Sequence, residues 1–342
     1  MVIVGGRWKK YRRNQIMNNR YGEEYKGDSR FVAKCRKLQS IYREEIGEKI
    51  APYTDRYGNV HYYGNYIENG DIPKESGDGW KNFLTECAFK HAKDRVENKK
   101  EYETIEKDRL FNNLLSSQPM AFNLFCPLRQ MLRESIEKAT KVIKAALPNY
   151  PIQKVTEIAL EFIPEKYKEL TGDKSAMDAI IRFVDISGKE GFIAVETKYS
   201  ENLGKNAAYK KDGKGKKLPR AQSIDAIRKL RCFTKDVEES IIKGNIPLTQ
   251  IYRNFLLSEA YGFYNELQSY SIILAPEEHP TTQKELESLT NVLCDEYKKK
   301  IKKIKLEDFV NALINNCSEE YRVVFERFND RYLNFKKLNN LD

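Results

Sequence analysis

The chain has 342 residues, enough for about two domains of ordinary size, and its 11% of aromatic residues supply a core and exclude a wholly disordered protein. No apolar run approaches the roughly 18–20 residues of a membrane-spanning helix, so we expect no transmembrane segment. The 60 Lys and Arg residues exceed the 50 Asp and Glu residues by ten, a surplus that suits a polyanionic partner, nucleic acid before an anionic membrane surface.

Residues 1–150 predict a mainly helical N-terminal region. Apolar residues recur at three-to-four-residue spacing between 80 and 115, which is typical of amphipathic helix. A second helix is expected from Leu128 to Leu147, because Pro148 would end it. We interpret the run Phe122–Phe125 as a buried joint rather than as a substrate wall of stacking rings.

A change of periodicity after residue 150 predicts a second unit, 151–342. Val155–Phe162 alternates with a period of two and predicts a strand. The apolar runs Met177–Val184 and Gly191–Tyr199 are separated by turn-forming Asp, Ser and Gly residues, so we expect them to pair as a hairpin.

The rest of this unit predicts helices around one more strand. Helical patterns occur at Ala221–Phe233 and Leu248–Tyr264, and Tyr270–Ala275 predicts a strand. The lysine-rich run Lys298–Lys305 has two isoleucines three residues apart, which favours the solvent face of an amphipathic helix.

The predicted hairpin brings three charged residues together. A turn centred on Ser187 places Asp178 opposite Glu196, within roughly 5 Å by their Cβ atoms. Glu196 and Lys198 are two residues apart, so their side chains leave the same face of the strand. Two acids and an ammonium group are therefore expected to converge.

Such a group suits metal-assisted hydrolysis of a phosphodiester. Mg²⁺ and Mn²⁺ prefer carboxylate oxygens, and Mg²⁺ takes only one or two of them beside waters and phosphate oxygens. The carbonyl of Thr197 is a further candidate ligand, and Lys198 can orient or help deprotonate a metal-bound water and offset charge at phosphorus. The alternative is an exposed ion-pair cluster, but all three charges border apolar runs, where buried charge needs a reason.

The order of a strand with Asp178, a hairpin, Glu196-Thr197-Lys198, then a helix and a strand resembles the PD-(D/E)XK, or restriction-endonuclease-like, nuclease superfamily. The similarity of the core covers about Val155 to Glu278. It implies an α/β fold in which a mixed four-stranded sheet is flanked by helices. Further runs are similar to a bacterial restriction-endonuclease-like branch, namely Asn82-Phe83-Leu84, Asn113-Leu114-Leu115-Ser116-Ser117-Gln118-Pro119, Phe122-Asn123-Leu124-Phe125 and Lys198-Tyr199-Ser200-Glu201.

The resemblance implies that Asp178 and Glu196 bind the metal and that Lys198 is the catalytic lysine. Met177 stands where the family has proline, a departure that removes no ligand. Many members add an upstream acid, for which Glu161 is the candidate, with Glu157 and a plain solvent-facing role left open. On the later helix, Gln250, Arg253 and Asn254 resemble a site position of the family, against ordinary surface polarity.

A basic segment follows the predicted catalytic strand closely and could contact nucleic acid, or else be a solvated linker. Its cations are Lys205, Lys210, Lys211, Lys214, Lys216, Lys217 and Arg220.

These observations predict a Mg²⁺- or Mn²⁺-dependent nuclease acting on DNA, an endonuclease before an exonuclease, in defence against foreign DNA such as phage or in DNA processing. The competing hypothesis is a catalytically inactive nucleic-acid-binding scaffold, which the presence of both acids and the lysine disfavours. A homodimer or an activating partner is compatible with such an enzyme, and no membrane partner is expected. Scattered cysteines and histidines lack zinc-site spacing, and no secretion signal is recognisable, so we expect a cytoplasmic protein.

Overall fold

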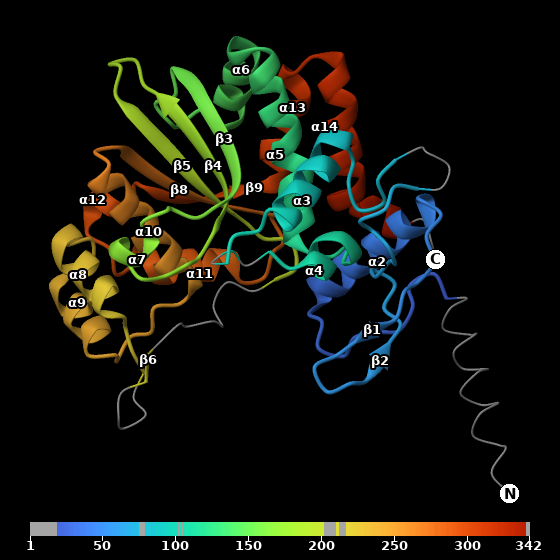
Figure 1. The fold of residues 1–342 in the computed structure, drawn as a ribbon, viewed down its shortest axis with the longest axis horizontal. Helices are drawn as coiled ribbons and strands as arrows, with labels where there is room; N and C mark the ends of the chain where they lie inside the picture. The colour runs from blue at the N-terminus through green and yellow to red at the C-terminus, as the bar shows by residue number, and fades with distance from the viewer. Residues whose placement is uncertain are drawn as a thin grey trace, which may run out of the picture.

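The computed structural model describes residues 19–74, 79–101, 103, 105–201, 210–211 and 217–339, with backbone alone at 210, 211 and 217. A five-stranded mixed sheet lies at its centre, in the order β3-β4-β5-β8-β9 (Figure 1). The first three strands pair antiparallel, and β5, β8 and β9 pair parallel. The strands are β3 (Lys154–Phe162), β4 (Met177–Val184), β5 (Glu190–Thr197), β8 (Gln268–Ala275) and β9 (Ile301–Lys305).

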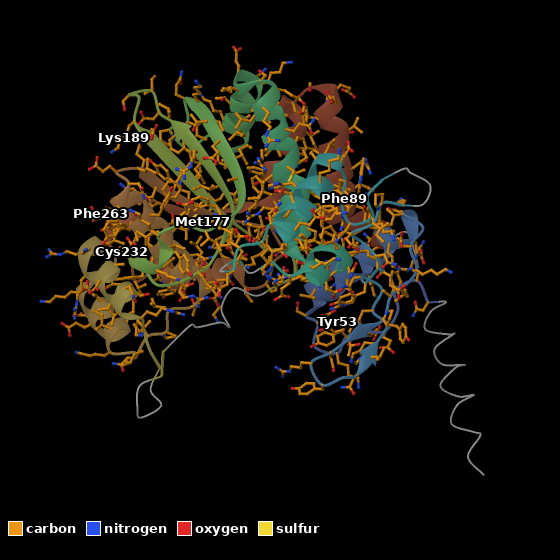
Figure 2. All side chains as sticks on the ribbon, in the orientation of Figure 1. Tyr53, Phe89, Met177, Lys189, Cys232 and Phe263 are labelled. Atoms are coloured by element: carbon orange, nitrogen blue, oxygen red, sulfur yellow. The ribbon has the colours of Figure 1, made fainter. Side chains whose placement is uncertain are left out.

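The β4–β5 hairpin has the predicted register. Ala179 pairs with Val195 and Ile180 with Ala194, so the hairpin is centred on Ser187 as expected. Asp185 builds the turn, because its Oδ1 accepts the backbone N–H groups of Ser187 and Lys189 at 2.8 and 3.0 Å. Figure 2 shows Lys189 near the outer tip and Met177, next to Asp178, deep in the molecule.

Helices cover both faces of the sheet, which confirms the expected α/β restriction-endonuclease-like architecture (Figure 1). Burial on both faces explains why β5 is an almost continuous apolar run. One face packs on α5 (Ser117–Glu134), α6 (Ile136–Ala146), α13 (Leu306–Asn316) and α14 (Glu319–Tyr332). The other packs on α7 (Tyr167–Leu170), α8 (Ala221–Leu230), α9 (Lys235–Ile242), α10 (Gln250–Tyr264), α11 (Thr282–Thr290) and α12 (Asp295–Lys298).

The N-terminal region is mainly helical, as expected, but its helices differ from those predicted. Helix α5 begins at Ser117, well before the predicted start, and Ser135 separates it from α6 by capping the latter through its Oγ. Both helices pack on β3, so the apolar core is continuous across residue 150, and the division into two domains stays a prediction. The remaining elements are α2 (Arg30–Glu45), β1 (Tyr53–Thr54), β2 (Val60–His61), α3 (Glu86–Glu97), α4 (Lys107–Asn112) and η1 (Phe335–Leu338).

The helix predicted at Lys298–Lys305 is wrong over most of its length, because Ile301–Lys305 forms the edge strand β9. Ile301 and Ile304 are an odd number of residues apart, so in a strand they face opposite sides, and each packs on a different apolar cluster. Lysines on this edge disfavour pairing with another chain. The sheet thus has one strand more than expected.

Two further observations complete the fold. Backbone pairing joins β6 (Lys210–Lys211) and β7 (Lys217–Leu218) into a small hairpin. No helix among the described residues is long and apolar enough to cross a membrane.

Candidate active site

A cavity of about 560 Å³ lies where β4 begins and β5 ends. Its wall combines the ends of three strands with residues of α10 and of the stretch that contains α4 and the start of α5. Two predicted residues, Thr197 and Asn254, do not line the cavity. Thr197 is fully buried, and Asn254 donates a hydrogen bond to Glu196, which does line it. The predicted residues that line the cavity are Glu161, Asp178, Glu196, Lys198, Gln250 and Arg253.

Three acids stand on three neighbouring strands. The pairs Leu160–Ala179 and Phe162–Met177 flank Glu161 and Asp178, so these two residues face each other across β3 and β4. The β4–β5 register continues in the same way to Asp178 and Glu196. The antiparallel order of β3, β4 and β5 therefore delivers one carboxylate per strand to the same cavity.

Asp178 is held by the residue that follows the second acid. Thr197 donates its backbone N–H and its hydroxyl to Asp178 Oδ2, each at 2.7 Å. Thr197 was expected to offer its carbonyl, so this grip on the first acid is an additional role. These two bonds fix the orientation of the Asp178 carboxylate.

Glu196 is held by the helix behind it. Its Oε1 accepts from Gln250 Nε2 at 2.8 Å and from Lys198 Nζ at 2.7 Å, and its Oε2 accepts from Asn254 Nδ2 at 2.7 Å. Gln250 and Asn254 are one turn apart, which puts both on the same face of α10. Arg253 instead forms an ion pair with Asp173 at 2.7 Å.

The structure separates the two candidates for the upstream acid. Glu161 is 6% exposed, and its Oε1 accepts from Gln118 Nε2 at 2.9 Å. Its φ of 49° is rare outside glycine and marks an irregular end of β3 beside the cavity. Glu157 lies outside the cavity, has a side chain 55% exposed and pairs with Arg182 at 2.8 Å.

The site holds more negative charge than its cations balance. Burial, together with the nearby charge of Asp178, raises the pKa of Glu196 to about 7 and that of Glu161 to about 7. Burial likewise raises the pKa of Asp178. Burial lowers the pKa of Lys198, but Glu196 and Asp178 outweigh it and raise that pKa above its ordinary value. Lys198 is therefore an ammonium ion at neutral pH.

The donor set fits a hard divalent cation. The charged ligands offered are carboxylate oxygens, which Mg²⁺ and Mn²⁺ prefer, and no histidine or cysteine lines the cavity in the described part of the chain. A cation would also relieve the charge excess that raises the carboxyl pKa values. Across the described ranges, no three Asp, Glu, His or Cys side chains meet as a ready-made cage, and Mg²⁺ typically needs only one or two of them.

Several residues that line the cavity were not predicted as site residues, among them Arg109, Ser117, Gln118 and Glu201. Glu201 Oε1 accepts the N–H and hydroxyl of Ser117 at 2.8 and 3.0 Å and the guanidinium of Arg109 at 3.0 Å. Glu201 and Ser117 fell within runs that carried the family resemblance, but no local pattern pairs residues so far apart in the sequence.

The predicted basic segment is described only in part. Lys205, Lys214 and Lys216 lie outside the described residues, and for Lys210, Lys211 and Lys217 only the backbone of β6 and β7 is described. Arg220 is exposed directly before α8 and does not line the cavity. Contact between these cations and nucleic acid stays a prediction.

The fold and this site define a protein of the nuclease class, with an acid on one strand and a Glu-x-Lys triplet on the next. A comparison with family models agrees: the model of the PD-(D/E)XK nuclease superfamily matches residues 26–334. The chain belongs to the PD-(D/E)XK nuclease superfamily, as the resemblance implied. Neither the curated proteins nor the solved structures searched contain a match to the chain.

Proposed function

We propose that this protein is a Mg²⁺- or Mn²⁺-dependent nuclease that hydrolyses phosphodiester bonds in DNA. One observation carries the proposal: Asp178, Glu196 and Lys198 line a single cavity in a chain of a nuclease superfamily. Glu196 and Lys198 are buried and Asp178 is half-buried, and charges removed from water in this way would be costly to keep without a function.

Asp178 and Glu196 would hold the metal, with the carbonyl of Thr197 as a further ligand and Glu161 as the third acid. The bound ion would polarise a phosphoryl oxygen and acidify a water molecule. Lys198, kept protonated by Glu196, would stabilise the negative charge that develops on the phosphoryl oxygens. Gln250 and Asn254 would keep Glu196 in one orientation.

DNA, internal cleavage and a role in defence against foreign DNA or in DNA processing rest on analogy with the superfamily. The net charge of +10 supports a polyanionic substrate. Because acids are abundant in the cavity, the surplus of positive charge lies outside it, where it could contact the rest of the polymer. One such site cuts one strand at a time, so concerted cleavage of both strands of a duplex would use two sites, in a dimer or with a partner.

The test is cleavage of circular and linear duplex DNA, single-stranded DNA and structured RNA with Mg²⁺, Mn²⁺ or EDTA. Wild type should cut with metal only, and the Asp178→Asn and Lys198→Met variants should not. Glu157→Gln is the matched control, an acid on the same sheet but outside the cavity, and should cut like wild type. Metal-dependent cleavage by Asp178→Asn would overturn the assignment. Binding without cleavage by wild type would favour the inactive scaffold.

A further inference from the structure

Arg109 lies on α4, in the N-terminal region, and lines the same cavity as the three acids. Its Nε donates to Ser116 Oγ at 3.0 Å and its Nη2 to Glu201 Oε1 at 3.0 Å. A guanidinium has five N–H donors in a planar fork. These two bonds fix the plane of the fork and leave its other N–H donors for a ligand.

Of the other three cations that line the cavity, two are committed to acids, and the third, Lys174, is an exposed ammonium without the planar fork of a guanidinium. Lys198 contacts Glu196 at 2.7 Å with a side chain 8% exposed, and Arg253 contacts Asp173 at 2.7 Å with a side chain 12% exposed. The side chain of Arg109 is 42% exposed, although it also has an acidic partner. Arg109 is thus the fixed arginine of the cavity that solvent, and therefore a substrate, can reach.

Glu201 holds Arg109 in this position. Its Oε1 binds Arg109 together with the first residue of α5, Ser117, and its Oε2 accepts the N–H of Ser200 at 3.2 Å. The carboxylate therefore joins α4, the start of α5 and the chain leaving β5. Because Lys198 is only three residues from Glu201, the same carboxylate holds Arg109 in a fixed position relative to Lys198.

We infer that Arg109 binds a phosphate of the substrate next to the one that is cleaved, and that Glu201 is its positioning residue. A planar guanidinium matches two phosphate oxygens at once, which an ammonium cannot do. The assignment rests on the proposed function, since it takes the polymer entering the cavity to be a nucleic acid. It adds a substrate contact from outside the strands that carry the acids.

The binding test is independent of cleavage. Affinity for a fluorescein-labelled linear DNA duplex is measured by anisotropy in EDTA over a series of salt concentrations, for wild type, Arg109→Gln, Arg109→Lys and Arg322→Gln. Loss of one phosphate contact lowers the slope of log K against log[salt] by about 0.9. Arg109→Gln should show this loss. Between 50 and 200 mM salt, the factor by which its affinity falls should be about three times smaller than the factor for wild type.

Arg322→Gln is the matched control. Arg322 is also an arginine with a side chain 42% exposed and an acidic partner, Glu319, but it lies on α14 and does not line the cavity. Its slope should equal that of wild type. Arg109→Lys should keep the slope but bind more weakly, because the charge remains and the fork is lost. An unchanged slope in Arg109→Gln, with thermal unfolding like that of wild type, would overturn the inference.

The role of Glu201 is tested by a double-mutant cycle. Glu201→Gln alone should reduce the slope. In the Arg109→Gln background the same substitution should cause no further reduction, because the residue that Glu201 positions is already absent. In cleavage assays, Arg109→Gln should raise KM more than it lowers kcat. A reduced slope with no cleavage by wild type would retain the phosphate contact and reject the nuclease. Cleavage by wild type with unchanged KM in Arg109→Gln would reject the contact alone.

Discussion

Thr197 donates both its backbone N–H and its hydroxyl to one oxygen of Asp178, each at 2.7 Å. The two residues stand on adjacent strands, so the hairpin register itself sets the orientation of the carboxylate. Thr197→Val keeps the shape and the N–H but removes the hydroxyl. Because partners of metal ligands typically contribute 10- to 100-fold to metal affinity, we expect about a tenfold loss of Mn²⁺ affinity by calorimetry. Thr197→Ser should restore it, and equal binding by all three proteins would contradict this role.

Lys198 and Asp178 should separate metal binding from chemistry. Lys198→Met removes a positive charge next to Glu196, so Mn²⁺ should bind at pH 8 at least as tightly as to wild type. Cleavage should nevertheless fall by about 10²-fold or more, as when one preorganised donor to developing charge is lost. Asp178→Asn should lose both properties. Paired calorimetry and cleavage assays distinguish the two variants, and a Lys198→Met protein that no longer binds Mn²⁺ would mean that the lysine supports the metal site itself.

Metal binding should release protons near pH 6. The pKa values of Glu196 and Glu161 are about 7 in the folded protein, above their ordinary value, so both carboxyls carry protons at pH 6 that a cation must displace. Affinity for Mn²⁺ should therefore rise with pH and level off above about pH 7. Calorimetry at pH 6 in buffers with different ionisation enthalpies measures the released protons, and heats that do not depend on the buffer would contradict the prediction.

His279 should make the free energy of unfolding depend on pH between about 4 and 6.5. It is 4% exposed, its Nε2–H donates to the carbonyl of Glu201 at 2.9 Å, and its Nδ1 accepts the N–H of Thr281 at 3.4 Å. Burial lowers its pKa from 6.5 to about 4. The unfolded chain therefore takes up a proton first, and the stabilisation by neutral His279 is present above pH 6.5 and is lost towards pH 4.

That loss amounts to about 3 kcal/mol for a shift of this size. His279→Gln can make both hydrogen bonds but does not titrate, so the difference in unfolding free energy between wild type and variant should shrink as pH falls from 6.5 to 4. Urea unfolding across this range measures it. A difference that stays constant would show that His279 is accessible to protons in the folded state.

Arg331 supports the N-terminal region from the opposite end of the chain. It is 1% exposed, its Nη1 donates to the backbone carbonyl of Asn82 at 2.8 Å, and its Nε donates to Gln39 Oε1 at 3.1 Å. Arg331→Met fills similar space but leaves two buried acceptors, Gln39 Oε1 and Asn82 Oδ1, without the guanidinium that donates to them, at about 1 to 3 kcal/mol each. We expect unfolding at a clearly lower urea midpoint. An unchanged midpoint would mean that water replaces the guanidinium.

The strands that carry the acids could be predicted from the sequence, and their surroundings could not. The β4–β5 hairpin was predictable because apolar runs buried on both faces flank a short turn of Asp, Ser and Gly residues, which leaves one good register. Strand β9 was missed because it is short and rich in lysine, and an odd isoleucine spacing is compatible with either structure. Gln250 and Asn254 were identified as candidates by resemblance, whereas their bonds to Glu196 required the packing of α10.

The bond between Gln118 and Glu161 has a consequence for any attempt to divide the protein. Gln118 and Ser117, at the start of α5, orient acids that lie 43 and 84 residues later in the chain. The segment from β4 to Lys198, which holds Asp178 and Glu196, is thus not an independent functional unit. Grafted onto another scaffold or expressed as residues 151–342, it would carry the signature of the superfamily without the partners that orient Glu161 and Glu201. The sequence motif alone is therefore not sufficient to reproduce the site.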